Sequence, residues 1–167
     1  MDLDNLIEKQ QTVLIELSTT LNIPVSVCGL LLRSYQWKNE KLLIDYFDNP
    51  NKVCKEAGVD LKNITENVIS GNKGEEVECS VCLDDVDGND LMALESCKHF
   101  FCKNCWRNYL HVAIDDGPSC LQVTCLYKSC NFVVNEKIVN QTVDKNRLKK
   151  YTKYLSKSFI DDNPRIK

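Results

Sequence analysis

The stretch that decides the fold runs from Cys79 to Cys130 and reads CSVCLDDVDGNDLMALESCKHFFCKNCWRNYLHVAIDDGPSCLQVTCLYKSC. It contains four pairs of metal-ligand residues, spaced Cys79-x2-Cys82, Cys97-x-His99, Cys102-x2-Cys105 and Cys125-x4-Cys130. Ligands this close together in the chain can reach one ion from a single turn. Zinc takes four sulfur or nitrogen ligands in a tetrahedron, and a closed set of four is typical of a structural site. The eight residues therefore predict two structural zinc ions.

A disulfide framework is the alternative interpretation of these clustered cysteines. The chain starts Met1-Asp2-Leu3-Asp4, without the basic residues and the apolar run that precede a signal-peptide cleavage site. We therefore expect a reducing compartment, the cytoplasm or the nucleus. Clustered cysteines in such compartments more often bind metal than form disulfides.

Composition and charge narrow the class of protein. The chain has 167 residues, of which 43% are hydrophobic, so one or two folded domains are expected. No run approaches the roughly 18 apolar residues that a membrane-spanning helix needs, and we expect no membrane partner. The formal net charge of -3 provides no broad positive field for nucleic acid. We therefore expect no nucleic-acid partner.

The N-terminal region, residues 1–69, is predicted to be a small helical bundle. Its first helix has apolar residues at helical spacing, namely Leu3, Leu6, Ile7, Leu14, Leu17 and Leu21. Pro24 is expected to begin a second helix, Asn39 to cap a third, and Gly58 to end a fourth. Helices this short do not persist alone in water, so they must pack together. Cys28 and Cys54 are then small packing residues.

The next segment, residues 70–78, reads Ser-Gly-Asn-Lys-Gly-Glu-Glu-Val-Glu and offers little to bury. We predict a linker there, followed by a zinc domain over residues 79–143. Within that domain, Cys102 to about Ile114 should be helical and should end at the Asp-Asp-Gly-Pro sequence 115–118. Short extended pieces are expected at Val123 and at residues 132–134. So small a domain has little apolar core, and zinc supplies on the order of 10 kcal/mol of folding free energy per site.

The last segment, residues 144–167, carries eight basic and three acidic residues and is predicted to be a basic amphipathic helix. Its apolar stripe consists of Leu148, Tyr151, Leu155 and Phe159, and the lysines lie largely on the other side. Pro164 is expected to end it. The basic face is either solvated or a surface for an acidic partner. The predicted fold class is thus α plus a small zinc-stabilised α/β module.

The order of the ligands resembles that of a RING domain. In that family the ligand pairs interleave, so that the first and third pairs share one zinc ion and the second and fourth share the other. The resemblance implies two cross-braced sites, Cys79, Cys82, Cys102 and Cys105 for zinc 1, and Cys97, His99, Cys125 and Cys130 for zinc 2. The spacing by itself also allows a sequential pairing, as in tandem zinc ribbons.

Two further features resemble the RING-between-RING (RBR) ubiquitin ligases of the Ariadne subgroup. The four residues between Cys125 and Cys130, with Trp106 after the fifth cysteine of the set, are similar to the first RING of that group. Residues 30–50, LLLRSYQWKNEKLLIDYFDNP, resemble its UBA-like domain. The family continues with an in-between-RING domain and a second RING that carries the catalytic cysteine. We interpret the chain, which stops at Lys167, as the part before those domains.

This resemblance implies the function of an E3 ubiquitin-protein ligase. The RING would recruit a ubiquitin-conjugating enzyme charged with ubiquitin, and the implied docking residues are Val81, Trp106, Tyr109 and Leu126. The UBA-like domain would bind ubiquitin or the ubiquitin-like modifier carried by cullins, within cullin–RING complexes. The residues predicted for that contact are Ile23, Tyr46 and Phe47, which packing of the bundle explains equally well.

No catalytic residue is expected within the chain, because a thiolate bound to zinc in a closed site cannot act as a nucleophile. Cys120 lies outside the ligand set and is interpreted as an incidental loop residue, since no histidine base neighbours it in sequence. Two alternatives to a ligase stay open. One is a non-enzymatic adaptor for a conjugating enzyme and a modifier. The other is a PHD-type reader, but such modules usually have cysteine fourth and histidine fifth, the reverse of His99 and Cys102.

Overall fold

The computed structural model describes residues 3–162 and divides into two compact units. One unit, here called the helical unit, combines the chain up to Thr65 with the chain from Thr152 onward. The other, here called the zinc-ligand unit, comprises Glu66–Tyr151. The chain passes between the units twice, once after Thr65 and once within its last helix. Among the described residues, no single helix is long and apolar enough to cross a membrane.

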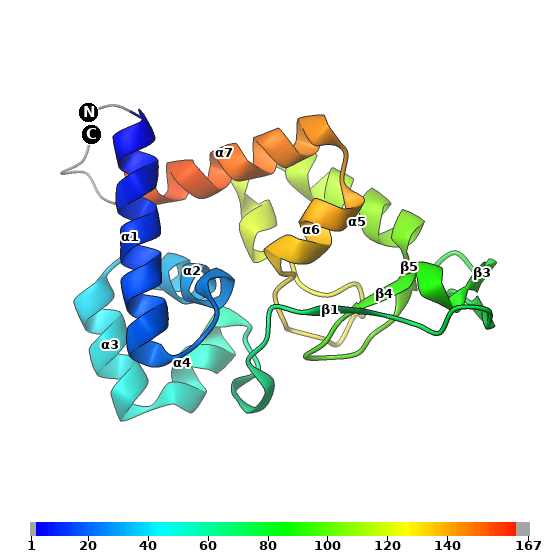
Figure 1. The fold of residues 1–167 in the computed structure, drawn as a ribbon, viewed down its shortest axis with the longest axis horizontal. Helices are drawn as coiled ribbons and strands as arrows, with labels where there is room; N and C mark the ends of the chain where they lie inside the picture. The colour runs from blue at the N-terminus through cyan, green and yellow to red at the C-terminus, as the bar shows by residue number, and fades with distance from the viewer. Residues whose placement is uncertain (1–2, 163–167) are drawn as a thin grey trace. The chain divides into compact units, whose positions relative to one another are not determined.

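The helical unit contains α1 (Leu3–Leu21), α2 (Val25–Ser34), α3 (Asn39–Asp48), α4 (Pro50–Ala57) and a 3₁₀ turn at Leu61–Asn63 (Figure 1). The periodic apolar residues of these helices form one core, which includes Leu14, Leu17, Leu31, Leu32, Leu42 and Val53. Cys28 and Cys54 are buried in this core, so their prediction as packing residues is confirmed. The side chains of Leu3 and Leu6 lie outside the described residues, as does Pro164.

The ends of these helices differ slightly from the prediction. Pro24 is the N-cap of α2 rather than its first residue. Asn39 is the first residue of α3, and Lys38 occupies the cap position without a side-chain hydrogen bond. The reason is the preceding turn, in which Gln36 and Trp37 both adopt positive φ angles of 54° and 60°. That turn is fixed by a hydrogen bond from the N–H of Trp37 to the carbonyl oxygen of Leu32, at 2.7 Å.

Two small antiparallel sheets form one side of the zinc-ligand unit. The first contains β1 (Val68–Ser70), β4 (Leu91–Leu94) and β5 (Phe101–Cys102) in the order β1-β4-β5. The second is a hairpin of β2 (Glu76–Glu78) and β3 (Asp85–Asp87), in which Val77 is opposite Val86. All four residues of β4 are buried. Strand β4 is therefore the centre of the larger sheet and part of the core.

The linker predicted over residues 70–78 is wrong, because its two ends are strand residues of the two sheets and the residues between them join these strands. Strand β1 ends at Ser70, and β2 occupies the last three residues of the segment. Between the two strands, the backbones of Gly71 and Gly88 approach closely, and a Cβ built on Gly71 would lie 2.5 Å from the carbonyl oxygen of Gly88. The N–H of Gly88 also donates to the carbonyl oxygen of Glu75. Glycine here permits a close backbone approach and does not mark a flexible segment.

Helix α5 (Lys103–Asp116) packs against the sheet and against a second, shorter helix, α6 (Glu136–Thr142). The predicted helix and its end at the Asp-Asp-Gly-Pro sequence are confirmed for α5. The predicted extended pieces are also present, as a bridge between Thr124 and Val133. Helix α6 was not predicted. Its signal is Asn135, whose side chain accepts a hydrogen bond from the N–H of Ile138 at 3.0 Å and so caps the helix.

Helix α7 (Lys145–Asp162) begins in the zinc-ligand unit and ends in the helical unit. Asp144 accepts a hydrogen bond from the N–H of Arg147, and the Arg147 guanidinium pairs with Asp115 at 2.9 Å and with Asp144 at 2.7 Å. These hydrogen bonds lower the pKa of both carboxyl groups. The helix predicted for residues 144–167 is confirmed by α7, although this helix belongs to both units and is not a separate segment. Within its apolar stripe Leu148 and Leu155 are half-buried, whereas Tyr151 is buried in one unit and Phe159 in the core of the other.

Candidate metal centres and partner surfaces

The first ligand cluster consists of Cys79, Cys82, Cys102 and Cys105, whose sulfur atoms lie within 4.8 Å of one another. The Sγ atoms of Cys79 and Cys105 are 3.8 Å apart, and those of Cys82 and Cys102 are also 3.8 Å apart. A tetrahedron with Zn–S bonds of about 2.3 Å has sulfur–sulfur edges of about 3.8 Å. The cluster therefore has the dimensions of a zinc site.

The second ligand cluster consists of Cys97, His99, Cys125 and Cys130, again within 4.8 Å of one another. The Sγ atoms of Cys97 and Cys125 are 3.8 Å apart, and Nδ1 of His99 lies 3.6 Å from Sγ of Cys125. The ring of Tyr127 stacks on His99 with centroids 4.3 Å apart and an interplanar angle of 15°. This contact holds the imidazole in the orientation that directs Nδ1 toward the sulfur atoms.

The pairing of the ligands is the cross-braced one that the RING resemblance implied. The first and third pairs form one cluster, and the second and fourth pairs form the other. The sequential alternative is excluded because β4 and β5 pair antiparallel, with Leu91 opposite Cys102. The antiparallel pairing brings the third ligand pair beside the first pair. The N–H of Cys102 donates to Sγ of Cys79 at 3.4 Å.

The thiols of each cluster differ in how readily they reach the ionised form, which is the form that binds zinc. Burial raises the pKa of Cys105, and the hydrogen bond with Cys97 together with burial raises the pKa of Cys125. Burial raises the pKa of Cys79, but hydrogen bonds from the backbone N–H groups of Cys102, Cys82 and Val81 outweigh it and lower that pKa to about 6. A hydrogen bond from the Cys125 thiol lowers the pKa of Cys97 to about 5. Each cluster thus contains a thiol that ionises at or below neutral pH. Two zinc ions fit these two donor sets.

The residues predicted to dock a conjugating enzyme are not equivalent in the structure. Val81 is 51% exposed on the loop between the first two ligands. Tyr109 and Leu126 are half-buried, and the Tyr109 hydroxyl donates to the carbonyl oxygen of Thr124 at 2.7 Å. Trp106 is fully buried, and its Nε1–H donates to the carbonyl oxygen of Met92 at 2.8 Å. The prediction of Trp106 as a docking residue is therefore wrong, because its ring is part of the core.

The residues predicted to contact a ubiquitin-like modifier also differ in their exposure. Ile23 is buried in the helical core with 8% exposure, so its prediction as a contact is wrong. Tyr46 is half-buried against the same core, whereas Phe47 on α3 is 67% exposed. Sequence reasoning missed Ile44, which is 70% exposed. It lies three residues before Phe47, on the same side of the helix.

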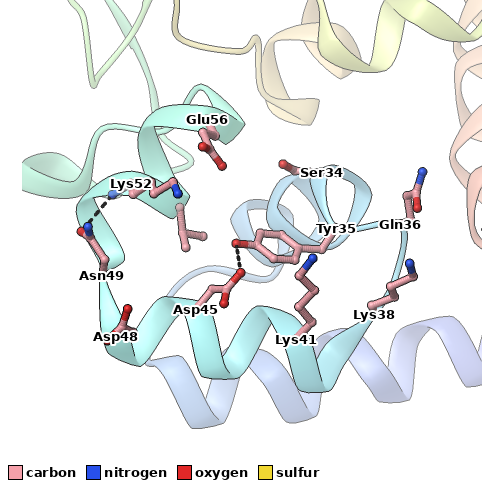
Figure 2. Close-up of a pocket in the computed structure, with 11 residues that line it drawn as sticks. Ser34, Tyr35, Gln36, Lys38, Lys41, Asp45, Asp48, Asn49, Lys52 and Glu56 are labelled. Atoms are coloured by element: carbon pink, nitrogen blue, oxygen red, sulfur yellow. Dashed lines mark hydrogen bonds between the residues drawn. The ribbon is translucent and has the colours of Figure 1, made fainter.

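A polar cavity of about 410 Å3 lies between the end of α2, α3 and α4. Figure 2 shows Lys41 and Asp45 of α3 on its wall, with Lys52 and Glu56 of α4 opposite. The Tyr35 hydroxyl donates to Asp45 at 2.9 Å, and burial together with this carboxylate raises the pKa of Tyr35 to about 12. The wall of this cavity thus carries charges of both signs.

The three cysteines outside the clusters are all buried. Cys28 and Cys54 are in the helical core, and Cys120 lies in the 3₁₀ turn Pro118–Gln122 of the zinc-ligand unit. Burial raises the pKa of Cys28 to about 11 and also raises the pKa of Cys54. These thiols are therefore neither accessible nor, for the two helical ones, readily ionised.

Comparison with known protein families finds a match for two parts of the chain. Residues 79–130 match the family model of the C3HC4-type zinc finger, the RING finger. Residues 8–48 match the model of the UBA-like domain of the E3 ubiquitin-protein ligase ARIH1. The class of protein is thus a zinc-binding RING protein with a UBA-like domain before the RING.

Similar full-length proteins identify the family. The probable E3 ubiquitin-protein ligase rbrA of Dictyostelium discoideum is 32% identical over 166 residues, which is 98% of this chain and 31% of that protein. The probable E3 ubiquitin-protein ligase ARI11 of Arabidopsis thaliana is 28% identical over 98% of this chain and 30% of its own length. Dbl4 of Schizosaccharomyces pombe, an E3 ubiquitin-protein ligase, is 31% identical over 82% of this chain and 26% of its own. The chain belongs to the Ariadne family of RBR proteins, and it spans less than a third of these relatives.

Proposed function

We propose that the zinc-ligand unit recruits a charged ubiquitin-conjugating enzyme as part of an RBR ubiquitin ligase. The observation that carries this proposal is the exposed Val81 on a loop that two cysteines of a cross-braced cluster fix at both sides. An apolar residue on a rigid loop loses little freedom when a partner covers it. The names of the relatives, which are E3 ubiquitin-protein ligases, support the same function.

The chemistry of such a ligase is acyl transfer from the thioester of the conjugating enzyme to a thiol nucleophile and then to a lysine amine. In this proposal the residues of the chain bind and orient the conjugating enzyme, which carries the ubiquitin. None of its thiols is suited to receive ubiquitin, because seven are zinc ligands and the other three are buried. In this proposal the receiving cysteine lies outside residues 1–167.

Shortening Val81 tests the docking surface. We expect Val81→Ala to weaken binding of a conjugating enzyme about tenfold, or about 1.4 kcal/mol, because two methyl groups leave the centre of the contact. Calorimetric titration of the chain with purified conjugating enzymes measures the affinity. Zinc content should stay at two ions per chain, since Val81 is exposed and is not one of the ligands. An unchanged affinity would refute the assignment of Val81.

A discharge assay separates recruitment from transfer. We expect the chain to bind a conjugating enzyme loaded with ubiquitin without accepting ubiquitin on its own cysteines. Non-reducing electrophoresis detects a thioester on the chain, and Cys120→Ser identifies its position if one forms. A thioester on Cys120 would show that the buried thiol becomes accessible and would overturn the recruiting role. The non-enzymatic adaptor would behave alike here, but would fail to support transfer when a second RING is supplied.

We also propose that the helical unit binds a ubiquitin-like modifier through the exposed pair of Ile44 and Phe47 on α3. The support is the family match of residues 8–48 and the exposure of two large apolar residues on one helix side. Cullin–RING complexes that carry such a modifier are the corresponding assembly. Of the residues predicted from the sequence for this contact, the proposal keeps Phe47, and it adds Ile44.

The matched pair Phe47→Ala and Ile23→Val tests this second surface. Phe47→Ala should lower the affinity for ubiquitin or for the cullin-linked modifier by more than tenfold, because an exposed aromatic contact is lost. Ile23→Val should cost only about 1 kcal/mol of stability and leave the affinity unchanged. Chemical-shift perturbation by each modifier reports both effects. If neither modifier perturbs α3, the helical unit has another role.

A further inference from the structure

The ring of His99 must point in one direction if the second ligand cluster is to hold zinc. A histidine that binds a metal usually donates its other ring N–H to a carboxylate, a carbonyl oxygen or a water molecule, and this hydrogen bond fixes the ring. Nδ1 of His99 lies 3.6 Å from Sγ of Cys125, so Nε2 is the nitrogen that would donate. Within residues 3–162, no protein atom accepts a hydrogen bond from Nε2 of His99. A different contact must therefore orient this ring.

The side chain of Tyr127 supplies that contact. Its ring stacks on the imidazole of His99 with centroids 4.3 Å apart and an interplanar angle of 15°. Rotation of the imidazole out of its plane would bring the two rings into collision, so the stack keeps Nδ1 directed toward the sulfur atoms. Tyr127 itself is 50% exposed, whereas the core aromatic Trp106 is fully buried. Burial in the core therefore does not explain an aromatic residue at position 127.

The loop between the last two ligands gives Tyr127 this position. Four residues separate Cys125 from Cys130, whereas two separate the ligands in each of the other two cysteine pairs. The N–H of Cys130 donates to the carbonyl oxygen of Tyr127 at 2.9 Å, and the N–H of Tyr127 donates to the sulfur of Cys125. The backbone of Tyr127 is thus held on both sides, and the longer loop provides a side chain that reaches His99.

We infer that Tyr127 is a positioning residue for the second zinc site, where its ring orients His99 in place of a hydrogen-bonding partner. The hydroxyl group is not needed for this role, because the stack uses only the ring. The first cluster has four cysteine ligands and no imidazole, so it does not depend on Tyr127. The two zinc sites should therefore respond differently to a change at this position, whether or not a conjugating enzyme is bound.

The test compares Tyr127→Ala, Tyr127→Phe and the control Lys128→Ala in the full, zinc-loaded chain. Lys128 is the next residue of the same loop and is also exposed. Competition with a chromophoric chelator at constant pH measures the affinity for each of the two ions. Tyr127→Ala should weaken the binding of one ion about tenfold, the lower end of the effect of removing a group that orients a metal ligand. The other ion should be unaffected, and Tyr127→Phe and Lys128→Ala should retain both affinities.

The nitrogen resonances of the histidines identify the ion that is affected. The chain has only two histidines, His99 and His111, and His111 belongs to neither cluster. The ring-nitrogen shifts of His99 therefore report zinc binding at the second site directly. In Tyr127→Ala they should change to those of a free imidazole when the more weakly held ion leaves.

Equal affinities in the original chain and in Tyr127→Ala would overturn the inference, because the stack would then contribute nothing to zinc binding. A loss in Tyr127→Phe as large as in Tyr127→Ala would assign the effect to the hydroxyl group instead. Equal weakening of both ions would show a general loss of stability and no role in orienting His99. If Tyr127→Ala binds only one ion from the outset, a free His99 supports the inference and a metal-bound His99 contradicts it.

Discussion

Removal of zinc is expected to unfold the zinc-ligand unit and to leave the helical unit folded. The two ligand clusters join the segments that carry Cys79, Cys97 and Cys125. Each structural site contributes on the order of 10 kcal/mol, which is comparable to the whole stability of a small domain. The helical unit has a continuous apolar core without any ligand. It therefore does not depend on metal for its fold.

Hydrogen exchange after chelation distinguishes the two units within one sample. Amides of Leu31 and Leu42 should stay protected, whereas those of Leu110 and Ile138 should exchange freely. The matched variants are Cys105→Ser, which should reduce the zinc content from two ions to one, and Cys120→Ser, which should leave it at two. Continued protection of α5 in the metal-free chain would contradict a zinc-dependent fold, and so would a zinc content below two in the original chain.

Trp106→Ala is expected to destabilise the zinc-ligand unit by about 3–5 kcal/mol, the cost of removing a fully buried aromatic side chain. The ring has 0% exposure, packs edge-on against Phe101 with centroids 5.7 Å apart, and donates a hydrogen bond to Met92. Denaturant unfolding of the zinc-loaded chain, followed by circular dichroism, measures this loss. Binding of a conjugating enzyme by the folded fraction should not change.

Trp106→Phe separates packing from hydrogen bonding at the same position. Phenylalanine keeps an aromatic ring but leaves the carbonyl oxygen of Met92 without its donor, which costs about 1–3 kcal/mol in a buried site. The expected order of stability is therefore the original chain, then Trp106→Phe, then Trp106→Ala. If Trp106→Phe retained full stability and abolished binding of the conjugating enzyme, Trp106 would be a docking residue after all.

The metal ligands and the helices were predictable because both depend on local spacing. Two residues between cysteines bring sulfur atoms to one side of a turn, and a period of three to four apolar residues gives one buried side of a helix. The ligand set, α1 to α5 and the packing role of Cys28 and Cys54 were all identified in this way. Helix α6 was missed because its apolar residues, Ile138 and Val139, are too few to show a period.

The exposure of side chains was less predictable. Apolar residues in similar sequence surroundings lie in the core at one position and at the surface at another. Trp106 and Val81 are both apolar residues next to zinc ligands, yet one is in the core and the other faces solvent. Ile23 and Ile44 differ in the same way in the helical unit. Glycine posed a related problem, since Gly71 is typical of a linker by composition and in fact permits a close contact with Gly88.

The amino-acid sequence by itself determined which atoms can bind zinc and where the longer helices lie, because these properties arise within a few residues of chain. The tertiary structure alone decided that the ligand pairs interleave, that Ser70 and Glu76–Glu78 are strand residues and that Leu83 adopts a left-handed conformation. Each of these depends on segments distant in sequence, such as β4 against β5 and Cys79 against Cys102. The spacing of residues along the chain does not reveal such contacts, because they arise only when the sheet forms.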